Sequence, residues 1–251
     1  MNNNKIIITD TFGFPEEVQP STASKVIPEW YKNLDSYLTG KKEPNGEGQT
    51  NGTIKKCMPV FDSISLGYML YTPVDVWVKQ NKQPPKEIKL TDVIDESQLE
   101  TQPFYEWPSF EMITFHPIEQ APTHPNRNGH NESYPKWMNP WSIKTPDGYS
   151  CLFVSPFHRD LPFTILPGVV DTDKYDAPVN FPFVLNSPTT FSGLIPAGTP
   201  MAQVIPFRRD SWELKEGEQE DIVRQSKTMT KLRTRFFDSY KNQFRQSKEY
   251  H

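Results

Sequence analysis

The chain has 251 residues, of which 35% are hydrophobic and 23% charged, with 25 prolines, 2 cysteines and a net charge of -4. Proline is about 10% of the chain, roughly twice its usual share, which excludes a fold of mainly long helices because a proline inside a helix costs about 3 kcal/mol. The net charge gives no basic field for nucleic acid, and two cysteines are too few for a disulfide framework. These features predict a mainly β protein.

The start of the chain and its hydropathy predict neither secretion nor membrane insertion. Only the isoleucines Ile6 to Ile8 stand between Lys5 and Asp10, which is too short for the apolar region of a signal peptide. No run of eighteen apolar residues occurs anywhere in the chain. We therefore expect a soluble protein with no signal peptide, no transmembrane segment and no membrane partner.

The N-terminal half predicts short strands and one short helix. Residues 5–8 read as a strand, and residues 24–34 as a helix with Pro28 in its first turn. Apolar runs between residues 53 and 78, rich in β-branched and aromatic residues, predict further strands. Another strand is expected over residues 111–116.

Residues 143–209 form the densest region of expected strands, with short apolar runs separated by Pro, Gly and Asp. The chain then changes character, because after Gly217 it has no proline or glycine. Acidic residues begin this segment and basic residues end it, as a helix dipole favours, so a C-terminal helix is predicted. Its apolar stripe recurs every four residues and is the expected interface: Leu232, Phe236, Tyr240 and Phe244. With no linker before the helix, we expect one β-rich domain over residues 1–212 and a helical tail over residues 213–251, packed on that domain or on a neighbouring subunit.

The region between Thr145 and Ile205 carries short motifs in a definite order. They are Thr145-Pro-Asp-Gly-Tyr149, Cys151-Leu-Phe-Val-Ser-Pro156, Leu166-Pro-Gly-Val-Val-Asp171-Thr-Asp-Lys-Tyr175, Val179-Asn-Phe-Pro-Phe-Val-Leu-Asn186 and Ile195-Pro-Ala-Gly-Thr-Pro-Met-Ala-Gln-Val-Ile205. In order and spacing this region, about residues 143–207, resembles the β-fold of trimeric dUTPases and dCTP deaminases. The resemblance implies two packed antiparallel sheets in a jelly-roll or dUTPase-like arrangement, and the residue patterns described above add a short N-terminal helix and a C-terminal helix.

The resemblance also implies a site on a hairpin at Asp171. Asp171 falls where that family has its water-activating carboxylate, and Tyr175 near the tyrosine that stacks on deoxyribose, after one extra residue, Lys174. The implied ligand-binding residues are Tyr175, Arg159, His158 and Gln203. A second interpretation stays open, because Gly, Asp and Asp at this spacing are also what a β-turn favours.

Two departures from the family pattern weaken the case for catalysis. Pro156-Phe-His-Arg159 stands where the family has Pro-Arg-Ser, so the serine is missing and the arginine is shifted. A charged helix replaces the glycine-rich C-terminal arm that closes over a triphosphate. No metal site is expected either, since the tripeptide His158-Arg-Asp160 has only His251 after it as a third ligand for an iron triad. Mg²⁺ is expected only if the chain is a nucleotide hydrolase, and no other cofactor is predicted.

Most of the chain also resembles a family of proteins carried by large tailed bacteriophages. The matching segments are Ile27-Pro-Glu-Trp-Tyr-Lys-Asn-Leu34, Lys55-Lys-Cys57-Met-Pro-Val-Phe-Asp62, Gly67-Tyr68, Asn139-Pro-Trp141-Ser-Ile-Lys-Thr-Pro-Asp-Gly-Tyr149 and Val204-Ile-Pro-Phe-Arg-Arg209. This resemblance implies a phage protein of the host cytoplasm or the virion, but no activity.

Two functions of different class follow. The favoured one is a non-catalytic virion or assembly component that forms a homo-oligomer or binds other phage proteins. The alternative is a dUTPase-like protein that binds or hydrolyses a small nucleotide, as a nucleotide pyrophosphatase, at the Asp171/Tyr175 hairpin. A nucleic-acid partner is not expected, because the basic side chains of the C-terminal helix are balanced by the acids before it.

Overall fold

The computed structural model describes residues 4–10, 12–44, 50–79, 112–117, 120, 133–186, 192–234 and 238–251. The chain divides into two compact units, each made of two separate segments. Unit 1 comprises Met1–Ser21 and Gly67–Arg209, and unit 2 comprises Thr22–Leu66 and Asp210–His251. The boundary at Arg209 lies close to the expected one at residue 212, whereas residues 22–66 group with the C-terminal segment.

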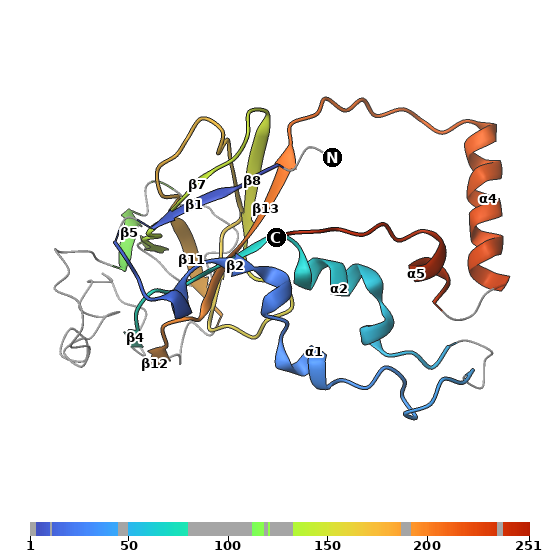
Figure 1. Ribbon diagram of the computed structural model, residues 1–251, viewed down its shortest axis with the longest axis horizontal. Helices are drawn as coiled ribbons and strands as arrows, with labels where there is room; N and C mark the ends of the chain where they lie inside the picture. The colour runs from blue at the N-terminus through green and yellow to red at the C-terminus, as the bar shows by residue number, and fades with distance from the viewer. Residues whose placement is uncertain are drawn as a thin grey trace. The chain divides into compact units, whose positions relative to one another are not determined.

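Unit 1 confirms the mainly β prediction and holds several antiparallel sheets (Figure 1). The larger sheets have the strand orders β10-β8-β13-β3-β2 and β5-β6-β11-β9, and two-stranded sheets pair β1 with β7 and β12 with β4. The strand bounds are β1 Ile7–Asp10, β2 Ser21–Thr22, β3 Tyr68–Tyr71, β4 Val76–Lys79, β5 Ile113–Pro117, β6 Ser133–Trp137, β7 Trp141–Lys144, β8 Tyr149–Val154, β9 Phe163–Ile165, β10 Gly168–Val170, β11 Phe181–Leu185, β12 Ser192–Ile195 and β13 Pro200–Arg208.

Side chains of the two larger sheets meet in one hydrophobic core. The rings of Phe153 on β8 and Phe181 on β11 lie 5.5 Å apart between centroids, so these sheets are in direct contact. Within the four-stranded sheet, Trp137 stacks on Phe183 with centroids 5.0 Å apart. Alternate residues of β7 are buried, as expected of a strand with one face on a core. The structure thus confirms two packed antiparallel sheets.

The turn at Asp171 is not a hairpin. β10 pairs with β8 in the five-stranded sheet, whereas β11 pairs with β6 and β9 in the four-stranded sheet. The segment between β10 and β11 therefore carries the chain from one sheet to the other. The motif resembled a hairpin because a glycine before a strand and aspartates after it are turn residues in either connection.

The strand prediction at residues 58–61 is wrong, because Met58–Ser65 forms helix α2. Pro59 lies in its first turn, where a missing N–H costs nothing. The expected strand over residues 64–71 is formed only from Tyr68 onward, as β3, because α2 extends to Ser65. The expected strand over residues 74–78 corresponds to β4. The short N-terminal helix is confirmed as α1, Glu29–Asn33, with Pro28 as its N-cap, and the residues before it form a 3₁₀ turn. The 3₁₀ turns are η1 Glu16–Val18, η2 Ala23–Lys25 and η3 Ile54–Lys56.

Unit 2 is held together by ion pairs between segments distant in sequence. The largely buried carboxylate of Asp62 on α2 accepts hydrogen bonds from the guanidinium of Arg245, the shortest at 2.7 Å, and from Lys248 at 2.9 Å. Asp238 pairs with Lys56 at 2.8 Å. These contacts fix the C-terminal residues on the segment that contains α2.

The C-terminal helix is confirmed, but it is interrupted. Helix α4 spans Gln219–Thr234 and α5 spans Ser239–Gln243, and between them Asp238 has a left-handed backbone with φ 57°. Leu232 lies on α4, Tyr240 on α5 and Phe244 just after α5, so these residues do not form one face of one helix. Phe236 lies outside the described residues. No helix in the described part of the chain combines the length and apolarity that a bilayer crossing requires.

Candidate functional site

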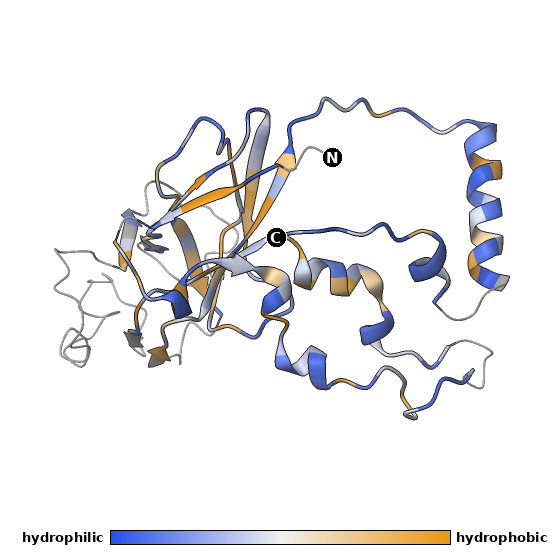
Figure 2. Cartoon of the chain, viewed as in Figure 1, coloured by the Kyte–Doolittle hydropathy of each residue, from blue (hydrophilic) through white to orange (hydrophobic). Residues whose placement is uncertain are grey.

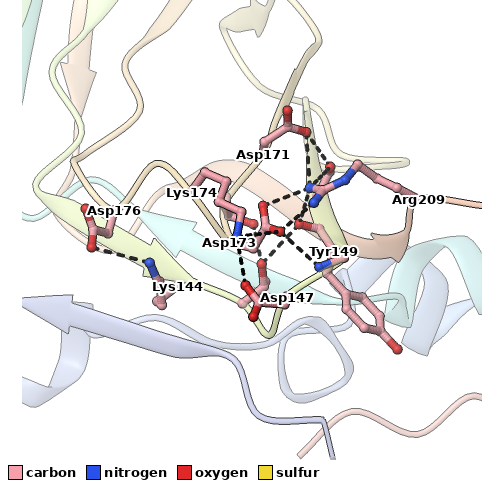
Figure 3. A network of polar contacts seen from close by, with 12 residues as sticks. Lys144, Asp147, Tyr149, Asp171, Asp173, Lys174, Asp176 and Arg209 are labelled. Carbon is pink, nitrogen blue, oxygen red and sulfur yellow. Dashed lines mark hydrogen bonds and ion pairs between the residues drawn. The ribbon is translucent and has the colours of Figure 1, made fainter.

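Three chain segments of unit 1 meet beside the start of β8 (Figure 3). They are the turn between β7 and β8, the residues that follow β10, and Arg209 directly after β13. The register explains the meeting, because β10 and β13 pair with opposite edges of β8. We call Gly148, Ser150, Asp171, Asp173 and Arg209 the Arg209 cluster.

Asp173 is the buried centre of the Arg209 cluster, with 1% of its side chain exposed. One carboxylate oxygen accepts a 2.8 Å hydrogen bond from Nη1 of Arg209, and the other accepts from Nη2. The second oxygen also accepts from the backbone N–H of Gly148 at 2.9 Å. The hydrogen bonds from Arg209 have the largest effect on the pKa of Asp173 and hold it far below its ordinary range, although burial by itself would raise it. Asp173 therefore acts as a structural anion that ties three segments together.

Asp171 differs from Asp173 in its exposure, since 62% of its side chain is accessible. Its Oδ1 accepts hydrogen bonds from Ser150 Oγ at 2.7 Å and from Arg209 Nη1 at 3.3 Å. The other oxygen makes no hydrogen bond to the described residues and can accept one from water or a ligand. The Tyr175 N–H donates to the Asp171 carbonyl at 2.9 Å, and the Tyr175 side chain is 49% exposed. An oriented, accessible carboxylate thus lies within one tight turn of an accessible aromatic ring.

The turn after β10 is further anchored to the start of β8. The N–H of Thr145 donates to the Thr172 carbonyl at 3.2 Å, and the two threonine hydroxyls are 2.8 Å apart. Lys174 pairs with Asp147 at 2.9 Å, at the exposed rim. These contacts make the turn a rigid part of unit 1.

Gln203, His158 and Arg159 lie beside the other end of β8. The fully buried Gln203 accepts a 3.0 Å hydrogen bond from the N–H of Phe157, and so fixes the turn after β8. His158 in this turn is exposed and has a left-handed backbone with φ 55°. Burial lowers the pKa of the half-buried Arg159 below its ordinary value.

The expected site residues therefore form two groups within the chain. Asp171 is bonded to Ser150, whereas Gln203 pairs in register with Val154, four residues further along β8. Four residues of strand span about 13 Å. The structure brings Asp171 and Tyr175 together at one end, and places Gln203, His158 and Arg159 at the other.

Mg²⁺, which a nucleotide hydrolase would bring, has one available carboxylate in the Arg209 cluster. Both oxygens of Asp173 are engaged by Arg209, so Asp171 alone would hold the ion, and substrate phosphates and water would have to complete its octahedral geometry. Across the described ranges no group of three or more His, Cys, Asp or Glu side chains is placed to hold a metal.

The sequence interpretation missed Arg209 and Ser150. Arg209 was visible only as the end of a basic pair after a strand, and its partner Asp173 lies 36 residues earlier. The signal that could have found it is charge complementarity, because a buried aspartate requires a cation and the nearest basic residue in the turn, Lys174, stays exposed.

The fold and the cluster together define a mainly β protein with packed antiparallel sheets and a buried arginine–aspartate tie at the start of β8. No protein-family model and no curated protein sequence matches the chain. Among solved structures the chain is similar to a mutant dUTPase from phage phi11 of S. aureus, with 11% sequence identity and a TM-score of 0.33. That similarity covers 86% of this chain and 98% of the other.

Proposed function

We propose that this chain is a non-catalytic phage protein, a virion or assembly component that self-associates through its C-terminal segment. The observation that carries the proposal is the exposure of large apolar side chains after β13. Trp212 is 88% exposed and Leu214 is 100% exposed, and both lie on the segment that leads to α4. Large apolar residues exposed close together mark interaction sites in soluble proteins.

The geometry of the candidate site supports the non-catalytic interpretation. Asp173, the second carboxylate of the motif, is paired with Arg209, and the expected ligand-binding residues His158, Arg159 and Gln203 lie about 13 Å from Asp171 along β8. A general base must lie within hydrogen-bond reach of the water it activates. Within one chain Asp171 is the candidate base, and the cation beside it, Arg209, is already paired with Asp173.

The proposal is tested with the full chain by light scattering at several concentrations, and by analysis of purified virions. We expect an oligomer, and a shift toward monomer in the double variant Trp212→Ser/Leu214→Ser. The matched control is Glu213→Ser/Lys215→Ser, which changes the neighbouring polar positions and should leave the oligomer intact. A monomeric wild-type chain that is also missing from virions would reject the proposal.

A nucleotide ligand is the second candidate, supported by the accessible Asp171 oxygen beside Tyr175. A base or sugar could stack on the Tyr175 ring while Asp171 accepts a hydroxyl hydrogen bond. Thermal-shift measurements against deoxynucleotides test this, with Asp171→Asn as the variant expected to lose the shift. Asp147→Asn is the control, since Asp147 is 89% exposed and lies on the same rim. If no nucleotide raises the melting temperature of the wild-type chain, this candidate is excluded.

A further inference from the structure

Helix α4 presents a narrow apolar stripe on a mainly polar surface, which also exposes Val223. Ile222 and Met229 are 54% and 44% exposed, and because they are seven residues apart they lie on the same face of the helix. Ser226 lies between them on that face. Figure 2 shows hydrophobic bands on this mainly hydrophilic helix. Two apolar residues at heptad spacing are the pattern with which one helix packs along another.

The charges of α4 are separated along its length. Glu220 and Asp221 lie in the first turn, and Lys231 and Arg233 in the last. Two copies side by side in parallel would bring acidic end to acidic end and basic end to basic end. In an antiparallel pair each acidic end meets the basic end of the other copy. The two helix dipoles then also point in opposite directions, which is their favourable arrangement.

The apolar stripe and the charge pattern agree on one register. If Ile222 of one copy packs against Met229 of the other, Glu218 is placed against Arg233, because both pairs are symmetric about a point between Gln225 and Ser226. Arg233 lies on the face of the stripe at the spacing of 3.6 residues per turn, and Glu218 directly precedes α4, where its carbonyl accepts from the N–H groups of Asp221 and Ile222. Hydrophobic and electrostatic contacts are therefore satisfied together.

We infer that α4 is the surface on which a second copy of this chain docks, in antiparallel orientation about a two-fold axis next to Ser226. This inference rests on the proposed self-association and adds the surface, the partner and the orientation. Helix α4 has 16 residues, a length of about 24 Å, so the pair is a small interface and forms in a concentration-dependent way. The exposed Trp212 and Leu214 lie on the segment that leads into α4.

Disulfide trapping of the full chain distinguishes the orientations. All variants carry Cys57→Ser, which removes the exposed native thiol, whereas Cys151 is buried. Ser226→Cys lies at the two-fold axis and should form an intermolecular disulfide on mild oxidation. Gln219→Cys lies on the same face but about 20 Å from its counterpart in an antiparallel pair, at 1.5 Å per residue, and should stay reduced. A disulfide requires Cα atoms about 4.4–6.8 Å apart.

Each outcome decides between the two proposals. Trapping of Ser226→Cys alone, together with loss of the dimer in Ile222→Ser/Met229→Ser, supports the antiparallel pair. The control Thr228→Ser/Lys227→Ser changes the opposite face and should keep the dimer. Trapping of both cysteine variants indicates parallel helices and overturns the inference. An oligomer in which neither variant is trapped overturns it while leaving the self-association intact, and a monomer overturns both the inference and the self-association on which it rests.

Discussion

Replacing Gly67 by alanine should weaken the pairing of β3 with β13 at its first residue. Gly67 has φ +71°, a left-handed backbone, and a Cβ at this position would lie 2.1 Å from the carbonyl oxygen of Val204. Real Cβ contacts essentially never fall under 3.0 Å, so β3 must move away from β13. The next residue, Tyr68, pairs with Val204 in register, and its end of the ladder is the part that opens.

The magnitude follows from two contributions. The left-handed backbone costs alanine about 1–2 kcal/mol, and opening the end of the ladder costs about another 1 kcal/mol for a lost hydrogen bond. We expect Gly67→Ala to lower the free energy of unfolding by about 2–3 kcal/mol in total. Gly198→Ala is the matched control, because Gly198 has φ +79° with nothing within 4 Å of its Cβ position. It should lose only the backbone part, about 1–2 kcal/mol.

Urea unfolding followed by tryptophan emission measures both variants, since Trp137 and Trp141 are fully buried in the core of unit 1. The difference between the variants should be at least about 1 kcal/mol, or about 2–4 °C in melting temperature. Equal losses in the two variants would refute the close approach of Gly67 to β13, and with it the register that places β3 beside β13.

Three further predictions concern the ion pairs and the cysteines. Burial tends to raise the pKa of Asp62, but hydrogen bonds from its basic partners bring it below 3.8. The stability that these bonds add is present above about pH 4 and is lost as the pH falls through the lowered pKa, so the melting-temperature advantage of the wild-type chain over Asp62→Asn should shrink below about pH 4. An advantage that does not depend on pH would contradict the pairing. Asp173→Asn should lower the melting temperature clearly, because it breaks a buried charged pair, whereas the exposed Asp171→Asn should change it by no more than about 2 °C; the reverse order would show that the buried tie is misassigned. Burial raises the pKa of the Cys151 thiol, so Ellman's reagent should titrate one thiol in the folded chain, lost in Cys57→Ser, and a second only after unfolding; two fast thiols would disprove the burial of Cys151.

The strands and terminal helices could be predicted because their signals are local. Proline content excluded long helices, and apolar runs between turn residues located most strands, including β8, β11 and β13. Met58–Ser65 shows where this fails, since its apolar residues fit either element and the proline in its first turn starts a helix as readily as it ends a strand.

The candidate site was only half determined by the sequence. The motif around Asp171 marked a turn with accessible polar residues, which is a local property. Contacts between residues far apart in the chain decide whether the flanking strands pair with each other. They also decide which cation pairs with Asp173.

The sequence by itself thus determined that this protein is mainly β, with an acidic-to-basic helix near its end, because composition and periodicity act over a few residues. Only the tertiary structure decided that β10 and β11 belong to different sheets, that Arg209 closes on Asp173, and that Gln203 lies apart from Asp171. Strand partners are selected by the burial of whole faces of a sheet and by the entropy of closing long loops. Both quantities depend on residues far apart in the chain, so no short segment determines them.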